Sequence, residues 1–316
     1  MRLIRGLHNL TPADRGTVAT IGNFDGVHRG HQAMLDLLRQ EAHVRDTAMS
    51  VISFEPDPRE YLAPEQAPAR ITSLRDKVLR LADLGVDRFL CLPFNDALAG
   101  MEPEQFIRRI LVDGLAVQYL VVGDDFRFGH RRKGDYDTLV RAGGRYGFTV
   151  TQTETIHDGR QRISSTRIRE ALARSDLAEA GRLLGYPYAI SGRVVHGDRI
   201  GRDLGFPTAN IRFHWKPALE GIFAVDASIE GGIPRPAIAS VGTRPTVNGR
   251  QPLLEVYLLE FSGDLYHRHL QVTFRHWIRG QTRFGDLDAL RAQIDRDVAE
   301  ARKWFASGRG PRPPQA

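Results

Sequence analysis

Two histidines three residues apart, His28 and His31, have the type and spacing that suit chemistry on a phosphate. An apolar run that ends at Ile21 is followed by a turn, and a helical pattern begins at about Gly30. The first backbone N–H groups of a helix lack intrahelical partners and carry partial positive charge. Both imidazoles are therefore expected to face an anion at this helix N-terminus. A loop with two solvated histidines is the alternative interpretation.

A second anion site is predicted within ISSTRIREALARSD at 163–176. Ser164 or Ser165 is expected to cap a helix there. Arg169 follows Ser165 by four residues and Thr166 by three, so its guanidinium shares one helix face with both hydroxyls. Taken alone, the pattern also fits an ordinary helix cap with a surface arginine.

The stretch GRVVHGDRIGRDLGFPTANI at 192–211 combines glycines with oxygen donors. The Thr208 hydroxyl and the Asn210 amide are hard oxygen ligands that suit Mg²⁺ bridged by nucleotide phosphates. No Walker-type loop with its lysine occurs in the chain, so a kinase here would need another phosphate cradle. Three glycines could supply it by exposing backbone N–H groups in tight turns: Gly197, Gly201 and Gly205. A glycine-rich hairpin with an asparagine turn is the alternative.

The run LLEVYLLEF at 253–261 is predicted to be a strand with one acidic side chain in a chemically useful place. In a strand, Leu254 and Val256 point to one face, and Glu255 points to the opposite face. Glu255 is thus expected to be able to meet a substrate. A solvent-facing strand carboxylate is the alternative.

The elements that position these residues change character along the chain. In the N-terminal half, strand patterns alternate with helical patterns, which predicts a parallel sheet covered by helices, with ligands beyond the carboxyl ends of the strands. The strands are expected at 17–21, 50–54, 88–92, 118–122 and 148–152, and the helices at 31–45, 73–84, 103–113 and 135–146. After helices at 165–174 and 176–184, the pattern becomes β, with strands at 188–195, 208–213, 221–230, 236–241, 253–261 and 268–276 and a last helix at 286–306.

The composition fits a soluble globular protein of two domains, with 316 residues, 41% apolar and 26% charged. No apolar run approaches the roughly 18 residues of a membrane helix, and the N-terminus lacks a signal-peptide core, so a cytoplasmic protein is expected. The single cysteine, Cys91, excludes an internal disulfide and a cysteine-built zinc site, and it is expected to be buried in a strand. The net charge of +6 fits a protein that handles nucleotides or nucleic acid.

Several of these stretches together carry a family resemblance. GNFDGVHRGHQ at 22–32 resembles the first signature of the bifunctional riboflavin kinase/FAD synthetases of bacteria, a version of the histidine–glycine–histidine motif of nucleotidylyltransferases. The stretch 163–176 resembles the second signature of the same nucleotidylyltransferases, and 192–211 resembles the riboflavin kinase signature over almost every position. AIASVGTRPTV at 237–247 also matches the family, and the resemblance covers about residues 1–306.

The resemblance implies an α/β plus β fold in two domains. Residues 1–185 would form a Rossmann-like FMN adenylyltransferase domain with a parallel sheet. Residues 186–306 would form an antiparallel β-barrel riboflavin kinase domain with a C-terminal helix. The tail 307–316 is expected to be disordered.

The resemblance also implies site residues in the first domain. It assigns catalytic roles to His28 and His31, and it places Asp125 at the flavin nucleotide. Asn23 and Asp25, within the first motif, are candidate substrate-binding residues. The triphosphate of ATP would be held by Ser165, Thr166 and Arg169.

In the kinase domain, the resemblance makes Glu255 the base that takes the proton from the riboflavin 5′-hydroxyl. Thr208 and Asn210 would hold Mg²⁺, and the glycines Gly197, Gly201 and Gly205 would contact substrate. The chain departs from the family pattern at five positions: Asp57 for a frequent histidine, Asp125 for asparagine, Phe223 for tyrosine, His267 for glycine and Gln281 for an acid.

The implied function is the synthesis of flavin cofactors in two steps. ATP would phosphorylate riboflavin to FMN, and a second ATP would adenylylate FMN to FAD with release of pyrophosphate. The expected partners are the small molecules riboflavin, FMN, FAD and ATP, without nucleic acid or membrane, in a monomer or weak homo-oligomer. One alternative is another small-molecule adenylyltransferase with a structural β domain. A nonenzymatic regulator that binds flavin or nucleic acid is the other.

Overall fold

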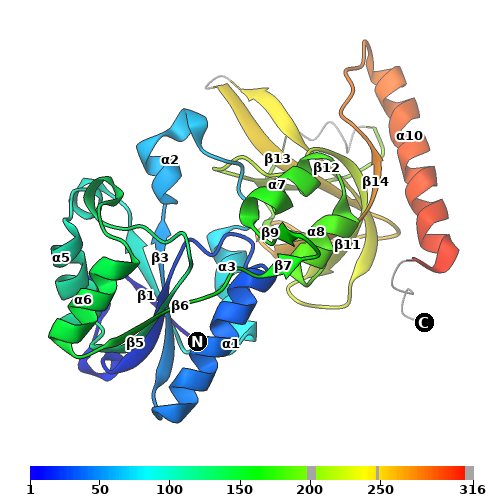
Figure 1. Ribbon diagram of the computed structural model, residues 1–316. Helices are drawn as coiled ribbons and strands as arrows, with labels where there is room; N and C mark the ends of the chain where they lie inside the picture. The colour runs from blue at the N-terminus through cyan, green and yellow to red at the C-terminus, as the bar shows by residue number, and fades with distance from the viewer. Residues whose placement is uncertain (198–203, 247–248, 310–316) are drawn as a thin grey trace. The chain divides into compact units, whose positions relative to one another are not determined.

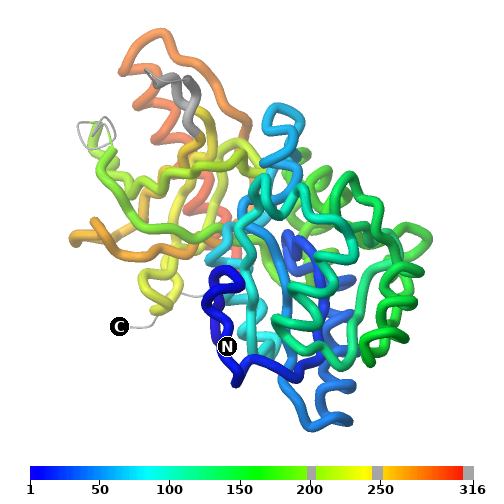
Figure 2. Tube along the Cα trace, turned by 90° about the vertical axis from the view of Figure 1, so that its left-hand side faces the viewer, coloured from blue at the N-terminus to red at the C-terminus, as the bar shows by residue number. Residues whose placement is uncertain are grey.

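The structure is a computed structural model that describes all residues except 198–203, 247–248 and 310–316. The chain folds into two compact units (Figure 1). Unit 1 comprises Met1–Pro68 and Leu74–Ser164, and unit 2 comprises Ala69–Ser73 and the residues from Ser165 onward. The chain path through each unit can be followed by its colour in Figure 2.

Unit 1 contains a six-stranded sheet in which every neighbouring pair of strands is parallel. The strands are β1 (Arg2–Arg5), β2 (Thr17–Ile21), β3 (Ala48–Glu55), β4 (Arg88–Pro93), β5 (Val117–Val122) and β6 (Thr149–Gln152). Their order is β1-β4-β3-β2-β5-β6, so the chain proceeds from β2 to one side of the sheet and later continues at β5 on the other side. Such a switch point leaves a crevice at the carboxyl ends of the strands, where ligands bind in α/β folds.

Helices cover both faces of this sheet (Figure 1). Val18 and Val51 share a core with Leu35 of helix α1, whereas Ala19 belongs to the core on the opposite face, with Ile107. The longer helices are α1 (Arg29–Val44), α3 (Leu74–Asp83), α5 (Pro103–Phe106) with the wider turn η4 (Ile107–Val112), and α6 (Tyr136–Tyr146). The shorter elements are η1 (Leu7–Asn9), η2 (Pro12–Asp14), α2 (Pro58–Leu62), η3 (Pro64–Gln66), α4 (Asp96–Ala99), η5 (His130–Arg132), and the hairpin of β7 (His157–Asp158) and β8 (Gln161–Arg162).

Unit 2 contains a six-stranded antiparallel sheet in the order β10-β13-β12-β11-β14-β9. A bridge between Val195 and Asn210 joins the chain after β9 to β10, so the sheet is a nearly closed barrel. The elements are α7 (Ser165–Ala173), α8 (Leu177–Leu184), β9 (Ala189–Arg193), β10 (Ala209–Arg212), β11 (Gly221–Ile229), β12 (Arg235–Thr246), β13 (Gly249–Leu258), β14 (His269–Arg279), α10 (Leu287–Trp304) and η6 (Phe305–Arg309).

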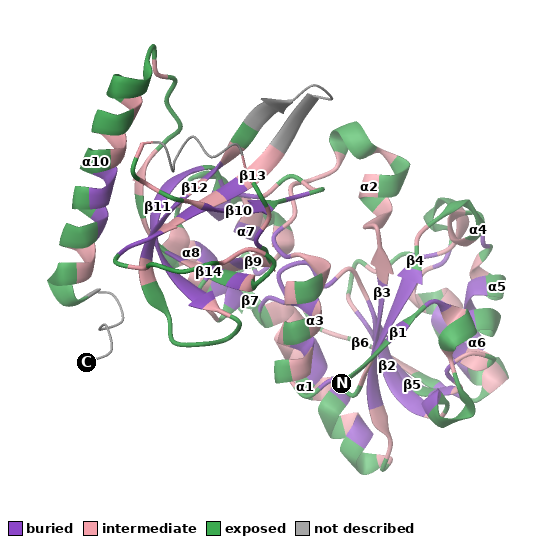
Figure 3. Ribbon diagram, turned by 180° about the vertical axis from the view of Figure 1, so that it is seen from behind, coloured by how far each residue is buried: buried purple, intermediate pink, exposed green. Residues whose placement is uncertain are grey.

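The residues of strand β11 are buried on both faces of the sheet (Figure 3), so a second element must cover the outer face. The Phe223 ring meets the edge of the Phe274 ring at 5.2 Å in the barrel interior. On the alternate face, Ile222 and Ala224 pack with Val298 of α10. The C-terminal helix therefore covers apolar side chains on the outside of the barrel.

Each segment predicted to be a helix or a strand is a helix or a strand in the structure, and its boundaries differ by a few residues. Cys91 is buried in β4 as expected. The strands expected at 236–241 and 253–261 belong to the longer hairpin of β12 and β13. The edge strand β1 was missed because only Ile4 of its four residues is buried, which leaves little apolar pattern.

Contacts group α7 and α8 with the barrel, so the two units meet in the sequence at Ser164 and Ser165. The domain boundary between 185 and 186 remains a prediction. The expected disordered tail begins inside η6 and continues mostly outside the described residues. Among the helices that the structure describes, none has the length and hydropathy to cross a bilayer.

Candidate functional sites

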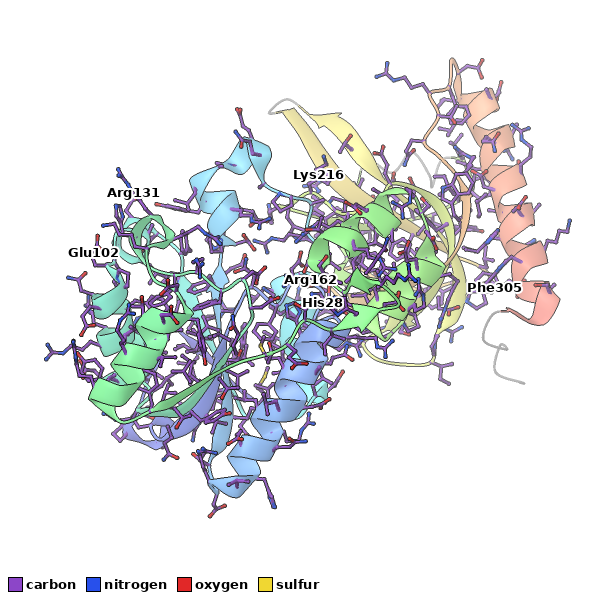
Figure 4. All side chains as sticks on the ribbon, in the orientation of Figure 1. His28, Glu102, Arg131, Arg162, Lys216 and Phe305 are labelled. Atoms are coloured by element: carbon purple, nitrogen blue, oxygen red, sulfur yellow. The ribbon has the colours of Figure 1, made fainter. Side chains whose placement is uncertain are left out.

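The loop from β2 to α1 brings His28 to the N-terminus of that helix (Figure 4). The His28 side chain caps the helix, with Nδ1 accepting a hydrogen bond from the backbone N–H of His31 at 3.3 Å. The two imidazole rings stack with their centroids 3.7 Å apart. The structure thus brings both predicted histidines to the end of α1 where backbone N–H groups lack intrahelical partners.

This loop has an unusual backbone that two buried side chains hold in place. Phe24, Gly26 and Val27 all have positive φ values, of 50°, 85° and 38°. Such values are uncommon for residues other than glycine and costly for a β-branched valine. Phe24 and Val27 are fully buried in the core beside α1, and the Phe24 ring lies 4.7 Å from the His31 ring. Core packing therefore stabilises the strained turn that presents the histidines.

The electrostatics around His31 favour its neutral form. Burial lowers the pKa of His31 well below its ordinary value, and the positive charges of His28 and Lys77 lower it further. The His31 Nδ1 atom is buried and has no hydrogen-bond partner among the described residues. A neutral imidazole with an unpaired ring nitrogen remains available to a ligand.

An NMR titration of the unliganded protein is expected to show His31 with a midpoint below the usual value of about 6.5. A histidine with a lowered folded-state pKa binds fewer protons when folded. It therefore reduces stability as the pH falls below about 6.5 until the folded-state pKa is passed. The resonance is assigned by its loss in His31→Gln. A midpoint of about 6.5 or above would contradict this account of the site.

The acidic side chains near this loop occupy different environments. Asp25 is buried in the loop itself. Asp57 caps α2 by accepting a hydrogen bond from the Arg59 N–H at 2.8 Å. The pKa of Asp57 is raised by burial, and the negative charges of Glu60 and Asp25 add to the rise. Asp57 stands where the family often has histidine. In this chain it caps a helix and has the negative charges of Glu60 and Asp25 nearby.

Lys77, a lysine of α3 that is only 6% exposed, was not among the predicted site residues. Its positive charge lowers the pKa of both His31 and Asp57. A lysine is seldom fully buried without a partner. One feature of the sequence could have indicated that Lys77 is buried. In the predicted helix at 73–84, its spacing places it on the same side as the apolar residues Leu74 and Leu81.

The predicted flavin-site residue Asp125 lies in the loop after β5 and is exposed. Arg162, which the sequence reasoning also missed, approaches Asp124 at 2.9 Å and Asp125 at 3.4 Å. Thr155 adds a hydrogen bond to Asp124. The two carboxylates are therefore held together by a cation from β8.

The second predicted motif begins helix α7. Ser165 is the first residue of this helix, and Thr166 is exposed in its first turn. The Arg169 guanidinium donates a hydrogen bond from Nε to the Ala69 carbonyl at 2.6 Å. These residues belong to unit 2, whereas Asn23, which accepts a hydrogen bond from Ser53 on its carbonyl, belongs to unit 1 with the histidines.

The barrel carries a cavity of about 810 Å³ on its outer face, between the strands and α10. Strand register explains how polar side chains reach it. Glu255 of β13 lies opposite Asn210 of β10 on one side and opposite Ser240 of β12 on the other. Glu255, Ser240 and Thr208 line the cavity, whereas Leu254 and Val256 are buried on the alternate face. The predicted orientation of Glu255 is confirmed.

Asn210, the ladder partner of Glu255, has a side chain whose orientation is set by a hydrogen bond. It is 6% exposed, and its Nδ2 donates a hydrogen bond to the Thr208 carbonyl at 3.1 Å. A Cβ added at Gly197 would lie 2.6 Å from the Asn210 amide, so the amide would have to move to make room for it. Gly205 has a φ of 91° in a turn, and Gly201 lies outside the described residues.

Three departures from the family pattern have defined places. Phe223 packs in the barrel interior against Phe274, and His267 has a φ of 65°, a conformation that favours glycine. Gln281 lines the cavity.

The fold and the site are those of a two-unit transferase, with a nucleotidylyltransferase-like α/β unit and a barrel unit that carries a cavity. The family model described as FAD synthetase matches residues 10–167, and the model described as riboflavin kinase matches residues 184–305. The chain belongs to the family of bifunctional riboflavin kinase/FMN adenylyltransferases. It phosphorylates riboflavin to FMN and adenylylates FMN to FAD.

Relatives match over nearly the whole chain. The bifunctional riboflavin kinase/FMN adenylyltransferase of Escherichia coli (strain K12) is 51% identical, with 96% of this chain and 98% of the relative covered. The protein of the same description from Pseudomonas fluorescens is 50% identical over 97% of this chain and 98% of the relative. A crystal structure described as a macrolide-efflux protein from Streptococcus pneumoniae has 29% identity and a TM-score of 0.77, covering 96% of this chain and 100% of that one. Efflux is the description of that protein, and the likeness to it concerns the fold.

Proposed function

We propose that His28 and His31 act in the adenylylation of FMN. In this reaction the FMN phosphate attacks the α-phosphate of ATP, and pyrophosphate leaves. The support is the stacked pair of imidazoles at the N-terminus of α1, which together with the backbone N–H groups can donate to phosphate oxygens. Asn23 and Asp25 would contact the nucleotide from the same loop. Asp125 would contact the flavin nucleotide, and Ser165, Thr166 and Arg169 would hold the triphosphate.

For riboflavin phosphorylation, Glu255 is proposed as the general base. It would accept the proton of the riboflavin 5′-hydroxyl while that oxygen attacks the γ-phosphate of ATP and ADP leaves. The observation that carries this role is its position on the cavity wall, in register with Asn210 and Ser240. Backbone N–H groups of the stretch around Gly197, Gly201 and Gly205 would contact the phosphates.

The donor set at the start of β10 fits Mg²⁺. Thr208 and Asn210 carry a hydroxyl and an amide oxygen two residues apart, and the hydrogen bond from Nδ2 orients the amide of Asn210. Mg²⁺ usually takes few protein oxygens together with substrate phosphates. A bound Mg²⁺ would neutralise charge on the transferred phosphate. Thr208 and Asn210 would hold the ion that positions this phosphate, and the hydrogen bond from Nδ2 would keep the Asn210 amide oxygen directed toward the ion.

Gly197→Ala is expected to weaken this site, because the new methyl group would displace the Asn210 amide. The predicted effect is a rise on the order of 10- to 100-fold in the Mg²⁺ concentration that gives half-maximal kinase activity, the range typical of lost ligand support. FAD synthesis from supplied FMN should not change. Gly144→Ala is the control, since a Cβ there meets no atom within 4 Å. An unchanged Mg²⁺ requirement in Gly197→Ala would remove Asn210 from the metal site.

The proposed boundary between 185 and 186 is tested with two fragments, 165–316 and 186–316. Both are expected to convert riboflavin to FMN with ATP and Mg²⁺, and neither should make FAD when FMN is supplied. The shorter fragment lacks α8, which contacts β14, so it should unfold at a lower temperature. If 186–316 folds by circular dichroism and makes no FMN while 165–316 does, the kinase domain begins at α7.

We also propose the partners, the compartment and the oligomeric state of the enzyme. Its partners would be small molecules and not nucleic acid, and it would work in the cytoplasm as a monomer or weak homo-oligomer. Size-exclusion chromatography with light scattering measures the last property.

A further inference from the structure

We propose that Arg279 and Asp297 are positioning residues for riboflavin phosphorylation, because they hold the wall of the barrel cavity that the flavin ring system contacts. This inference rests on the function proposed above, in which riboflavin binds in that cavity. Arg279 is the last residue of strand β14, and Asp297 lies in helix α10. Both side chains line the cavity.

Asp297 is the acceptor in a set of hydrogen bonds that joins α10 to β14. Arg279 Nε lies 2.8 Å from Oδ1 and 3.0 Å from Oδ2 of Asp297, and Arg279 Nη2 lies 2.6 Å from Oδ2. Gln293, one turn earlier in α10, donates to Oδ1 of Asp297 at 2.8 Å. Asp297 is only 3% exposed, so the pair is shielded from solvent. The planar guanidinium fork therefore fixes both the distance and the direction between strand and helix.

The same guanidinium also holds the segment that connects β14 to α10. Nη1 donates to the Gly280 carbonyl at 2.9 Å and lies 3.4 Å from the Thr282 hydroxyl. Cζ lies 5.8 Å from the centroid of the Phe284 ring, within the range of a cation–π contact. Thr282 and Phe284 line the cavity as well. The Arg279 side chain thus connects three parts of the cavity wall, which are β14, the segment 280–284 and α10.

The other contacts between α10 and the barrel are less directional. Val298 and Ala301 of the helix share an apolar cluster with Ile222 and Ala224 of β11, and apolar burial has no preferred direction. A buried ion pair contributes little net stability compared with apolar residues of similar volume, because desolvation offsets the attraction between the charges. The contribution expected from the pair is therefore the orientation of the helix.

The orientation of α10 decides where two apolar side chains of the cavity lie. Leu290 and Ile294 precede Asp297 by seven and three residues, so all three lie on one face of the helix. Leu290 and Ile294 line the cavity together with Phe284 and Ile222. The ring system of riboflavin is flat and largely apolar, whereas ATP is a polyanion. A shift of α10 should therefore weaken the binding of riboflavin more than the binding of ATP.

The test replaces the ion pair by an apolar pair in Arg279→Met/Asp297→Leu. The midpoint of thermal unfolding should stay near that of the wild type. The KM for riboflavin is expected to rise on the order of tenfold, which corresponds to lost contact with about two buried CH₂ groups. The kcat and the KM for ATP should change little, because this wall binds the substrate and the transition state equally. FAD synthesis from supplied FMN should not change.

Arg279→Lys is a second variant that does not depend on the folding of the first. Lysine keeps the positive charge beside Asp297 but lacks the planar fork. The KM for riboflavin should rise in the same direction by a smaller factor. A wild-type KM for riboflavin in the folded double variant would overturn the inference, and so would a wild-type KM in Arg279→Lys if the double variant does not fold.

Arg275 and Asp226 provide the matched control, because they form another buried pair, between β14 and β11. Arg275 Nε lies 2.6 Å from Asp226 Oδ2, and Asp226 is 1% exposed. Neither is among the described residues that line the cavity. Asp226→Asn and Asp297→Asn should both lower the unfolding temperature, since each removes a buried carboxylate charge from its arginine. Only Asp297→Asn should raise the KM for riboflavin. An equal rise in both variants would mean that lost stability causes the effect, which contradicts the inference.

Ile294→Ala is measured first, because it tests the cavity and leaves the ion pair in place. It removes apolar contacts from the same wall and should raise the KM for riboflavin. If the KM does not change, riboflavin does not bind against this wall, and the proposed function of the cavity fails together with the inference. If Ile294→Ala raises the KM while the folded Arg279→Met/Asp297→Leu variant keeps the wild-type value, the cavity remains the riboflavin site and only the inference is overturned.

Discussion

Replacing His28 and His31 together by alanine is expected to lower FAD synthesis by roughly 10² or more, the scale found for lost transition-state donors. The physical reason is the position of the two rings at the N-terminus of α1, where charge develops on the α-phosphate and on the leaving pyrophosphate. Because both rings act on the same phosphates, the double variant should lose less than the product of the single losses. FMN formation should persist, since the residues proposed for the kinase reaction lie in unit 2. FAD synthesis is measured by separating the products after incubation with FMN, ATP and Mg²⁺. FMN formation is measured in the same way after incubation with riboflavin, ATP and Mg²⁺.

His43→Ala is the matched control for this experiment, since His43 is an exposed histidine near the other end of α1. It should leave both reactions unchanged. Thermal melts of all variants are needed because the His28 side chain also caps the helix, and loss of a cap costs about 1 kcal/mol. Full FAD synthesis in a folded double variant would show that the histidines do not contribute to adenylylation.

The sequence pattern predicted the parts of this fold that depend on local periodicity. Strand β2 and helix α1 follow from the apolar run before Ile21 and from the spacing of Met34, Leu35 and Leu38. The orientation of Glu255 followed from strand alternation alone. Each of these inferences uses neighbouring residues in the chain, and each is confirmed by the structure.

Residues that meet across the fold could not be placed in this way. Lys77 reaches His31 electrostatically because α3 and α1 cover the same face of the sheet. Arg162 lies 38 residues from Asp124, and Gln281 lies 41 residues from Ser240. Strand register and loop paths decide these contacts, and sequence periodicity does not encode register across non-adjacent elements. The polar neighbours of the proposed catalytic groups were therefore the part that only the structure could supply.

Glu255→Gln is expected to lower riboflavin phosphorylation by about 10²–10⁴, the range usual for loss of a general base. Glutamine has nearly the same shape and can still accept a hydrogen bond through its oxygen, so the cavity wall should be preserved. It has no basic group that can take the proton of the 5′-hydroxyl. The loss should appear mainly in kcat, because the missing interaction develops as the hydroxyl proton is transferred. FAD made from supplied FMN should be unaffected.

The control is Glu300→Gln, the same exchange at an exposed position of α10 that does not line the cavity. It should leave both reactions at the wild-type rate. The pH dependence distinguishes a base from a binding group. In the wild type, kcat should fall as the pH decreases and Glu255 becomes protonated, whereas the small residual rate of Glu255→Gln should lack that acidic limb. If the variant keeps the wild-type rate and the wild-type limb, Glu255 is only a strand residue, and another group in the cavity must accept the proton.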